Sequence, residues 1–290
     1  MTKYKRNHFI SKGLIGFWKR PNGQVILWDR ENGPDLELRN IRSVHYRDYL
    51  YAKWDTDGNR DMRAEHFLGA EVDDKAPQVI KRLIQNWPPQ FPLDPTDRTF
   101  LIELIVRTIL RHPTIPNLAS RSVKIRFAML LLRAARWLGR NGEKDVAYDQ
   151  YGKGRVLFGE LMALSATLDI EQIVKQYVDR QISIMVLEEG APNFVLGTQP
   201  FLLNPNGAKD DIRLGAVIHP RIFIGIHQNN GADFFSVLSK EDVCRINGFF
   251  IRQSQHIVMV SSADIEGAWF DEIKLDGTSE RYYISVTANE

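Results

Sequence analysis

The hydrophobic pattern changes its period twice along this 290-residue chain, and this change most constrains the fold. Residues 1–50 and 182–290 carry short runs of β-branched and aromatic side chains, which are typical of strands. Residues 61–181 instead place apolar side chains three and four apart, which is typical of amphipathic helices. Because strands at both ends need partners for their edges, we predict an α+β fold. The terminal strands form a mixed or antiparallel sheet, and the helical middle packs against it.

The chain is long and apolar enough to be organised as one α+β domain over residues 1–290. Its hydrophobic content is 43 %, and no internal repeat or low-complexity segment divides it. The predicted helices of the middle part lie near 61–73, 75–86, 97–111, 119–139, 155–167 and 169–181.

A β-hairpin is predicted in residues 1–50, because Asn22-Gly23 separates two apolar runs at 14–18 and 24–29. Both turn residues tolerate positive φ, which tight hairpin turns require. A third strand is predicted over 36–44. In the C-terminal part, one helix is predicted over 240–254, with Ser239 as its cap. The C-terminal strands are predicted over 182–187, 193–196, 214–218, 222–226, 257–260, 269–273 and 282–286.

Charge and cysteine content favour a soluble protein of the cytoplasm. The 38 basic and 36 acidic side chains leave a net charge of only +2, so global charge identifies no partner. The single cysteine, Cys244, cannot form an internal disulfide. No apolar stretch of signal-peptide length follows the basic N-terminus, and the longest purely apolar run, 127–132, is too short to span a membrane.

Several short motifs resemble, in this order, those of a bacterial and fungal domain family of unknown function, number four-two-three-eight. They are Asn7-His8-Phe9-Ile10-Ser11, the strand 25–29, Tyr51 followed by Glu65 and Glu71, Arg111-His112-Pro113, the stretch 194–200, and Ile246-Asn247. The resemblance spans residues 7–262 and implies no established activity. Two departures stand out. The family's Tyr-Val-Pro reads Phe9-Ile10-Ser11 here, and an Asp of a second motif is absent from 196–200.

Basic charge is concentrated between Arg98 and Arg140, where nine basic residues accompany one acid, Glu103. Within the helix predicted over 119–139, four arginines share one face and apolar residues occupy another. These four are Arg126, Arg133, Arg136 and Arg140. Arginine suits bidentate contact with phosphate, so the face is a candidate site for RNA, DNA or an acidic protein. The alternative is that the arginines are solvated or pair with acids elsewhere in the fold.

An enzymatic alternative uses the same region. Arg107 and His112 have the Arg-x4-6-His spacing of the HEPN ribonucleases, which they resemble in this respect. Histidine can move a proton, and arginine can stabilise the charge on a phosphate undergoing cleavage. HEPN sites usually carry Asn, Asp or His after this arginine, whereas this chain has Thr108. The structural alternative places Arg111 and His112 at a helix C-terminus, where the macrodipole favours positive charge.

His8, Glu65 and Glu71 form a second candidate site, either a ligand site or a buried carboxylate–histidine tie between the N-terminal hairpin and the first helices. No metal or cofactor is expected. The acidic stretch 55–61 lacks calcium-loop spacing, and Asp264 with Glu272-Ile273-Lys274 matches a nuclease pattern that is common by chance. The residues do not decide between an enzyme and a binding protein. The three hypotheses are a nucleic-acid or acidic-partner binder, a ribonuclease or other phosphodiesterase, and a non-catalytic structural or partner-binding module.

Overall fold

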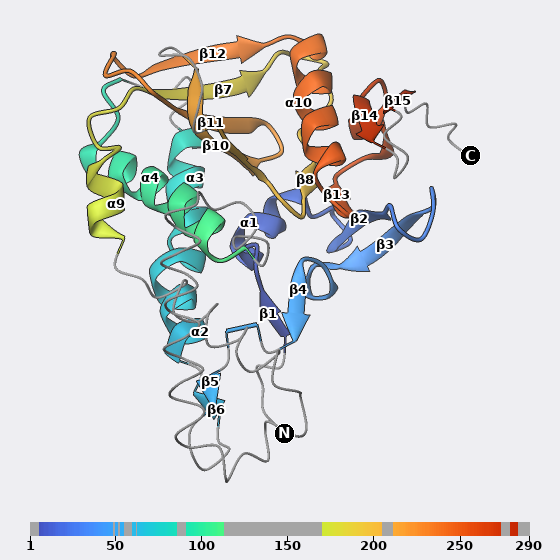
Figure 1. Cartoon of the computed structure of the whole chain (residues 1–290), viewed down its shortest axis with the longest axis horizontal. Coiled ribbons are helices and arrows are strands. Elements are labelled where there is room, and N and C mark those ends of the chain that lie inside the picture. Colours follow the sequence, from blue (N-terminus) through green and yellow to red (C-terminus); the bar gives the residue numbers. More distant parts are fainter. Residues whose placement is uncertain are drawn as a thin grey trace.

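The computed structural model describes residues 6–48, 50–51, 53–54, 60–61, 63–85, 91–112, 170–204, 211–273 and 279–283. Helices and strands carry the labels of Figure 1. The helices are α1 (Lys12–Ile15), α2 (Arg63–Leu68), α3 (Ala76–Gln85), α4 (Pro95–Leu110), α9 (Glu171–Lys175) and α10 (Lys240–Arg252). None of these described helices is long and apolar enough to cross a membrane.

The strands come from both ends of the chain, and the fold is α+β as predicted. The N-terminal strands are β1 (Arg6–His8), β2 (Gln24–Asp29), β3 (Leu36–Asn40), β4 (Tyr46–Asp48), β5 (Lys53–Trp54) and β6 (Arg60–Asp61). The C-terminal strands are β7 (Ile182–Leu187), β8 (Leu196–Gly197), β9 (Phe201–Leu203), β10 (Ile212–His219), β11 (Ile222–His227), β12 (Phe234–Leu238), β13 (His256–Met259), β14 (Trp269–Ile273) and β15 (Ser279–Tyr283).

Two larger sheets hold most of the described strands. One has the order β3-β2-β13-β8, so strands from the two ends of the chain are hydrogen-bonded side by side. The other has the order β12-β7-β11-β10-β9, with β12 parallel to β7 and the remaining pairs antiparallel. The short β1 and β4 pair only with each other within the described chain.

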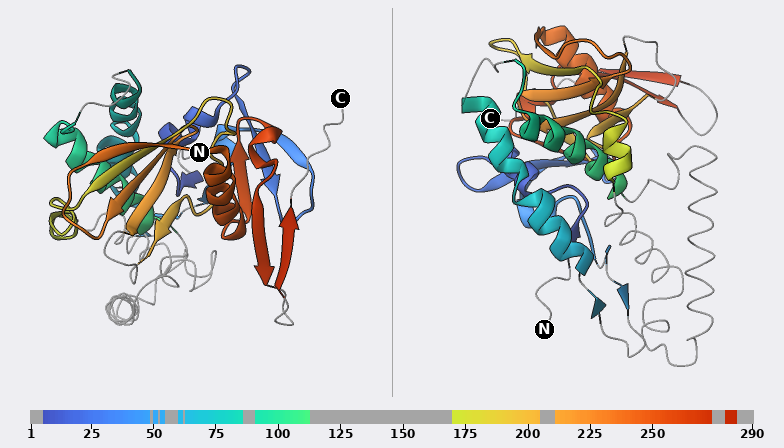
Figure 2. Two further views of the ribbon diagram at one scale, coloured as in Figure 1. Left: turned by 90° about the horizontal axis from the view of Figure 1, so that it is seen from above. Right: turned by 90° about the vertical axis from the view of Figure 1, so that its left-hand side faces the viewer.

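The helices lie around these sheets (Figure 1). Helix α4 contacts β9 and β10 of the five-stranded sheet, and α10 contacts β8, β12 and β14. The middle strand β11 is buried along its whole length, because both of its faces are covered. The hairpin of β14 and β15 projects from the body of the molecule (Figure 2).

The predicted hairpin of residues 14–18 and 24–29 is wrong in its first strand. Residues 12–18 are helical, with α1 followed by a 3-10 turn, and the Ser11 hydroxyl caps α1 by accepting a hydrogen bond from the Gly13 N–H. Leu14, Ile15 and Trp18 are all buried, and their spacing places them on one face of a helix. The hairpin partner of β2 is β3, reached through the later turn at Gly33, whose φ is 124°.

Most of the other predicted elements that fall on described residues are present with shifted ends. The helix predicted over 61–73 is α2 continued by a π-helical turn, Gly69–Asp73. The run 193–196 contributes only the short β8. The strands that were not predicted are β1, β4, β5, β6, β9 and β12. The helix predicted over 169–181 is reduced to α9. The helices predicted over 119–139 and 155–167 lie outside the described residues.

Candidate functional site

The segment 193–199, which contains β8, receives hydrogen bonds from three distant rings. The bonds run from Trp18 Nε1 to the Phe194 carbonyl (2.8 Å), from His45 Nε2 to the Leu196 carbonyl (3.1 Å) and from His112 Nε2 to the Thr198 carbonyl (2.7 Å). Because a carbonyl oxygen can only accept, both histidines carry a proton on Nε2. These rings satisfy backbone carbonyls within β8 and on either side of it, and β8 is the last described strand at its edge of the four-stranded sheet.

The same segment is held from α10 by Asn247, which is fully buried. Its side-chain oxygen accepts from the Val195 N–H at 3.1 Å, and its Nδ2 donates to the carbonyls of Asn193 and Asp264, both at 2.9 Å. The Asp264 carboxylate in turn accepts from Asn193 and from the backbone N–H groups of Val260 and Ser261. Burial raises the pKa of Asp264. Through these hydrogen bonds the Asp264 carboxylate joins the loop at Asn193 to the loop at 260–261. The side chain of Glu272, the other acid of the nuclease-like pattern, lies outside the described residues.

Arg111, the first residue after α4, is the most buried charged side chain of this region, with 2 % of its surface exposed. Its Nη1 lies 2.6 Å from Asp73 Oδ1, and its Nη2 donates to the His8 carbonyl at 2.8 Å. The Tyr51 hydroxyl donates to the Arg111 carbonyl at 2.9 Å, and burial raises the pKa of Tyr51. Arg111 thus joins β1, the end of the π-helical turn and the end of α4.

The three residues of the second candidate site, His8, Glu65 and Glu71, differ in how deeply they are buried. His8 is 3 % exposed, neither of its ring nitrogens has a partner within hydrogen-bond distance, and burial together with Lys12 lowers its pKa to about 4. Glu65 is partly buried on α2, and its negative charge helps to raise the pKa of Tyr51. Glu71 is exposed and binds Lys75 at 2.5 Å, so it is no part of a buried tie. Asp73 takes the place that was predicted for Glu71, because it binds Arg111, which in turn donates to the His8 carbonyl of β1.

Arg107 and His112 both lie inside the fold. Arg107 is 5 % exposed, its Nε lies 3.4 Å from Glu103 Oε1, and its guanidinium lies over the Phe67 ring at 4.9 Å. His112 is 2 % exposed and makes edge contacts with the rings of Phe9 and Phe201. At these exposures neither side chain presents a surface that a polymeric substrate can contact.

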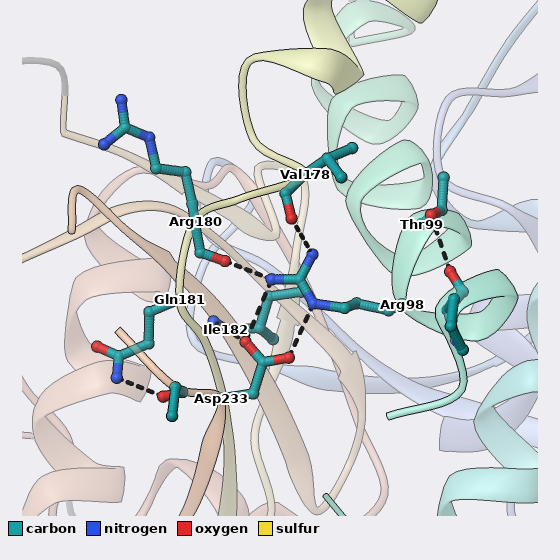
Figure 3. Close-up of polar contacts among 9 residues, drawn as sticks. Arg98, Thr99, Val178, Arg180, Gln181, Ile182 and Asp233 are labelled. Carbon is teal, nitrogen blue, oxygen red and sulfur yellow. Dashed lines mark hydrogen bonds and ion pairs between the residues drawn. The ribbon is translucent and has the colours of Figure 1, made fainter. Parts of the chain in front are cut away.

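Arg98, at the start of α4, is also engaged internally (Figure 3). Its Nε and Nη2 donate to the two oxygens of Asp233, at 2.8 and 3.2 Å, and its remaining donors bind the carbonyls of Val178 and Arg180. Asp233 Oδ1 also accepts from the Ile182 N–H at 2.8 Å. Arg98 thus joins α4 to the starts of β7 and β12.

The four arginines of the predicted helical face, Arg126, Arg133, Arg136 and Arg140, lie outside the described residues. Sequence reasoning missed Asp73 and His45. Asp73 has no local signal, because its partner Arg111 lies 38 residues away. His45 has a backbone φ of 48°, and no feature of the surrounding sequence predicts this left-handed conformation.

Among the described residues, no group of three or more His, Cys, Asp or Glu side chains is arranged to hold a metal ion. No curated protein and no solved structure matches the chain. A family model described as "Protein of unknown function (DUF4238)" matches residues 6–264, which include the β8 segment, Arg111, Asn247 and Asp264. Because this match covers most of the 290 residues, the chain belongs to the DUF4238 family.

Proposed function

We propose that this protein is a binding protein of the cytoplasm that contacts an anionic partner, with nucleic acid first among the candidates, through the basic residues of 121–140. The observation that carries this proposal is the distribution of arginines. Arg98, Arg107 and Arg111 have carboxylate partners inside the fold, whereas 121–140 holds six basic residues and no acid. Basic side chains that neutralise phosphates supply most sequence-independent affinity for nucleic acids.

The ribonuclease hypothesis receives less support from the same contacts. A general acid or base must come within hydrogen-bond reach of the substrate. The His112 Nε2 proton already binds the Thr198 carbonyl, and Arg107 is covered by Phe67 and paired with Glu103. Both residues therefore have structural roles that explain their presence without catalysis. The cytoplasmic assignment rests on Cys244, a buried free thiol and the chain's single cysteine.

Binding is measured by fluorescence polarisation with a labelled 20-nucleotide RNA and with a labelled DNA duplex, from 50 to 300 mM salt. The test variant replaces Arg126, Arg133, Arg136 and Arg140 by Gln. A control variant removes the same charge from exposed sites, with Gln at Arg39, Arg42, Lys75 and Lys81.

The first variant should lose at least tenfold in affinity, and its salt dependence should flatten by roughly one unit of slope for each phosphate that is no longer neutralised. The control variant should bind within about threefold of the unmodified protein, the loss coming only from long-range attraction. Equal losses in the two variants, or binding that does not depend on salt, would contradict the assignment to 121–140. Absence of any binding to either probe would redirect the proposal to an acidic protein partner.

A further inference from the structure

The ribbon formed by β1 and β4 is tied to the rest of the described fold by contacts of its own residues and of the residues next to it. Its strands pair over only three residues each, and within the described chain they join neither of the larger sheets. Isolated two-stranded ribbons are marginally stable in water, so this ribbon depends on its attachments. These attachments include the bond from Arg111 Nη2 to the His8 carbonyl, the bond from His45 Nε2 to the Leu196 carbonyl and the ring contact of Phe9 with His112. Phe9, Ile10 and Val44, which flank the ribbon, are also buried in the core.

Two buried histidines lie at these attachments. His8 is 3 % exposed and His45 is 2 % exposed, and the Phe9 N–H donates to the His45 carbonyl at 3.1 Å. Both ring nitrogens of His8 and the Nδ1 of His45 have no partner within hydrogen-bond distance. An additional proton on His45 would therefore be buried without an acceptor, and one on His8 would find only the backbone of Ile41, outside hydrogen-bond distance, so both protonations are costly. His45 also has a left-handed backbone, which is uncommon for a residue other than glycine.

The groups that surround the two rings give little compensation for added positive charge. Those acting on His8 are Lys12 of α1, the backbone of Ile41, Asp73 of the π-helical turn and Arg111 after α4, and the Tyr46 ring of β4 lies 6.1 Å away. Those acting on His45 are the Leu196 carbonyl, His8, His112 and His256, the last a residue of β13 that lies 3.4 Å from Asp29. Among the groups that act most strongly on the two rings, the one carboxylate is Asp73, and it is bound to Arg111.

We propose that the β1–β4 ribbon is an acid-released latch, in which protonation of His8 and His45 detaches the ribbon from Arg111 and from β8 while the five-stranded sheet stays folded. Release frees the Leu196 carbonyl and uncovers the apolar residues next to the ribbon, Phe9, Ile10 and Val44. The latch thereby makes the surroundings of the segment 193–199 sensitive to pH.

The size of the effect follows from the difference in proton affinity between the two states. Burial lowers the pKa of His8 to about 4 and that of His45 to about 3, whereas solvated rings in the released ribbon have a pKa near 6.5. The released state therefore binds more protons, so a fall in pH favours release. At pH 5 the protonation of each ring multiplies the equilibrium constant for ribbon release by about 30. Between pH 7 and pH 5 this constant therefore rises roughly several hundred-fold.

Hydrogen exchange read by mass spectrometry on the full chain tests the latch, with rates corrected for the pH dependence of intrinsic exchange. Peptides covering 6–10 and 44–48 should lose about two orders of magnitude of protection between pH 7 and pH 5. Peptides covering 182–187 and 222–227 in the five-stranded sheet should keep theirs. The logarithm of ribbon opening should change by about two per pH unit near pH 5, because two protons are taken up.

Variants separate the latch from general acid sensitivity. His8→Phe removes one titrating ring, whose nitrogens have no partner within hydrogen-bond distance, and should halve the pH slope. Adding His45→Asn, a residue that tolerates positive φ and retains a donor, should abolish the slope. His219→Asn is the matched control, since burial also lowers the pKa of His219 to about 4 but this residue lies on β10. The control should keep the wild-type slope.

Three results would overturn the latch: ribbon protection unchanged at pH 5, loss of sheet protection together with the ribbon, or a wild-type slope in the double variant. If the double variant fails to fold, two measurements still test the latch. One compares ribbon and sheet peptides of the wild-type protein, and the other is the pH slope of His8→Phe.

Discussion

Asp73→Asn should be among the most destabilising single-atom changes in this protein, because it leaves the Arg111 guanidinium buried without its carboxylate. The Arg111 side chain is 2 % exposed, and its Nη1 lies 2.6 Å from Asp73 Oδ1. Removal of one partner from a buried ion pair costs about 3–5 kcal/mol, since the remaining charge is left uncompensated. The amide introduced by the substitution can still accept one hydrogen bond, so we expect a loss of about 3 kcal/mol in the free energy of unfolding.

Two neighbouring ion pairs supply graded controls. Glu103→Gln affects Arg107, whose pair is longer, at 3.4 Å, and whose carboxylate is 31 % exposed, and should cost about 1 kcal/mol. Glu71→Gln affects a pair in which both side chains are about half exposed, and should cost less than about 0.5 kcal/mol. Urea unfolding at pH 7, followed by circular dichroism, gives the three values. If Asp73→Asn costs no more than Glu71→Gln, the assignment of Arg111 as the central structural charge is refuted.

Substitutions at three further positions test local packing and capping. Gly197→Ala should lose about 1–3 kcal/mol of stability, because its Cβ would lie 2.9 Å from the Ser254 Cβ and closer still to the Ser254 hydroxyl. Gly69→Ala, where a Cβ meets nothing within 4 Å, should be neutral or stabilising by up to about 1 kcal/mol, and the pair is compared by thermal unfolding. Ser239→Ala removes the acceptor of the Asp242 N–H at the start of α10 and should cost about 1 kcal/mol, whereas Ser239→Asp should restore most of it. A Ser239→Ala variant as stable as the unmodified protein would contradict the capping role.

Local signals in the sequence predict those elements whose causes are local. The start of α10 follows from Ser239, whose hydroxyl accepts from the Asp242 N–H as a cap does. The strand predicted over 14–18 is wrong because a run of five apolar and aromatic residues fits a strand or a helix. Its outcome depends on burial of Leu14, Ile15 and Trp18 against distant segments, such as the Phe194 carbonyl that accepts from Trp18. Tertiary contacts thus determine that residues 14–18 are helical and not a strand.

The candidate site is predicted only in part for a related reason. The family motifs mark His8, Arg111, His112 and Asn247, and the structure shows that the last three bind backbone groups of other segments. Their partners are carbonyls and N–H groups, which nearly every residue carries, so no residue type reveals them. The strand β12 is not predicted because polar and apolar residues do not alternate along it, since two phenylalanines precede Ser236 and two aliphatic residues follow it.

The central claim is that buried landmark residues stabilise the fold while the basic residues of 121–140 bind the partner. Its most direct test measures the free energy of unfolding and the dissociation constant for labelled RNA in the same two variants. His112→Phe keeps an aromatic ring but leaves the Thr198 carbonyl without its donor, so it should lose about 1–3 kcal/mol of stability with unchanged affinity. The variant with Gln at Arg126, Arg133, Arg136 and Arg140 should lose at least tenfold in affinity with stability changed by less than about 1 kcal/mol. Loss of RNA binding or cleavage in a stably folded His112→Phe protein, together with full activity in the four-arginine variant, would contradict the account.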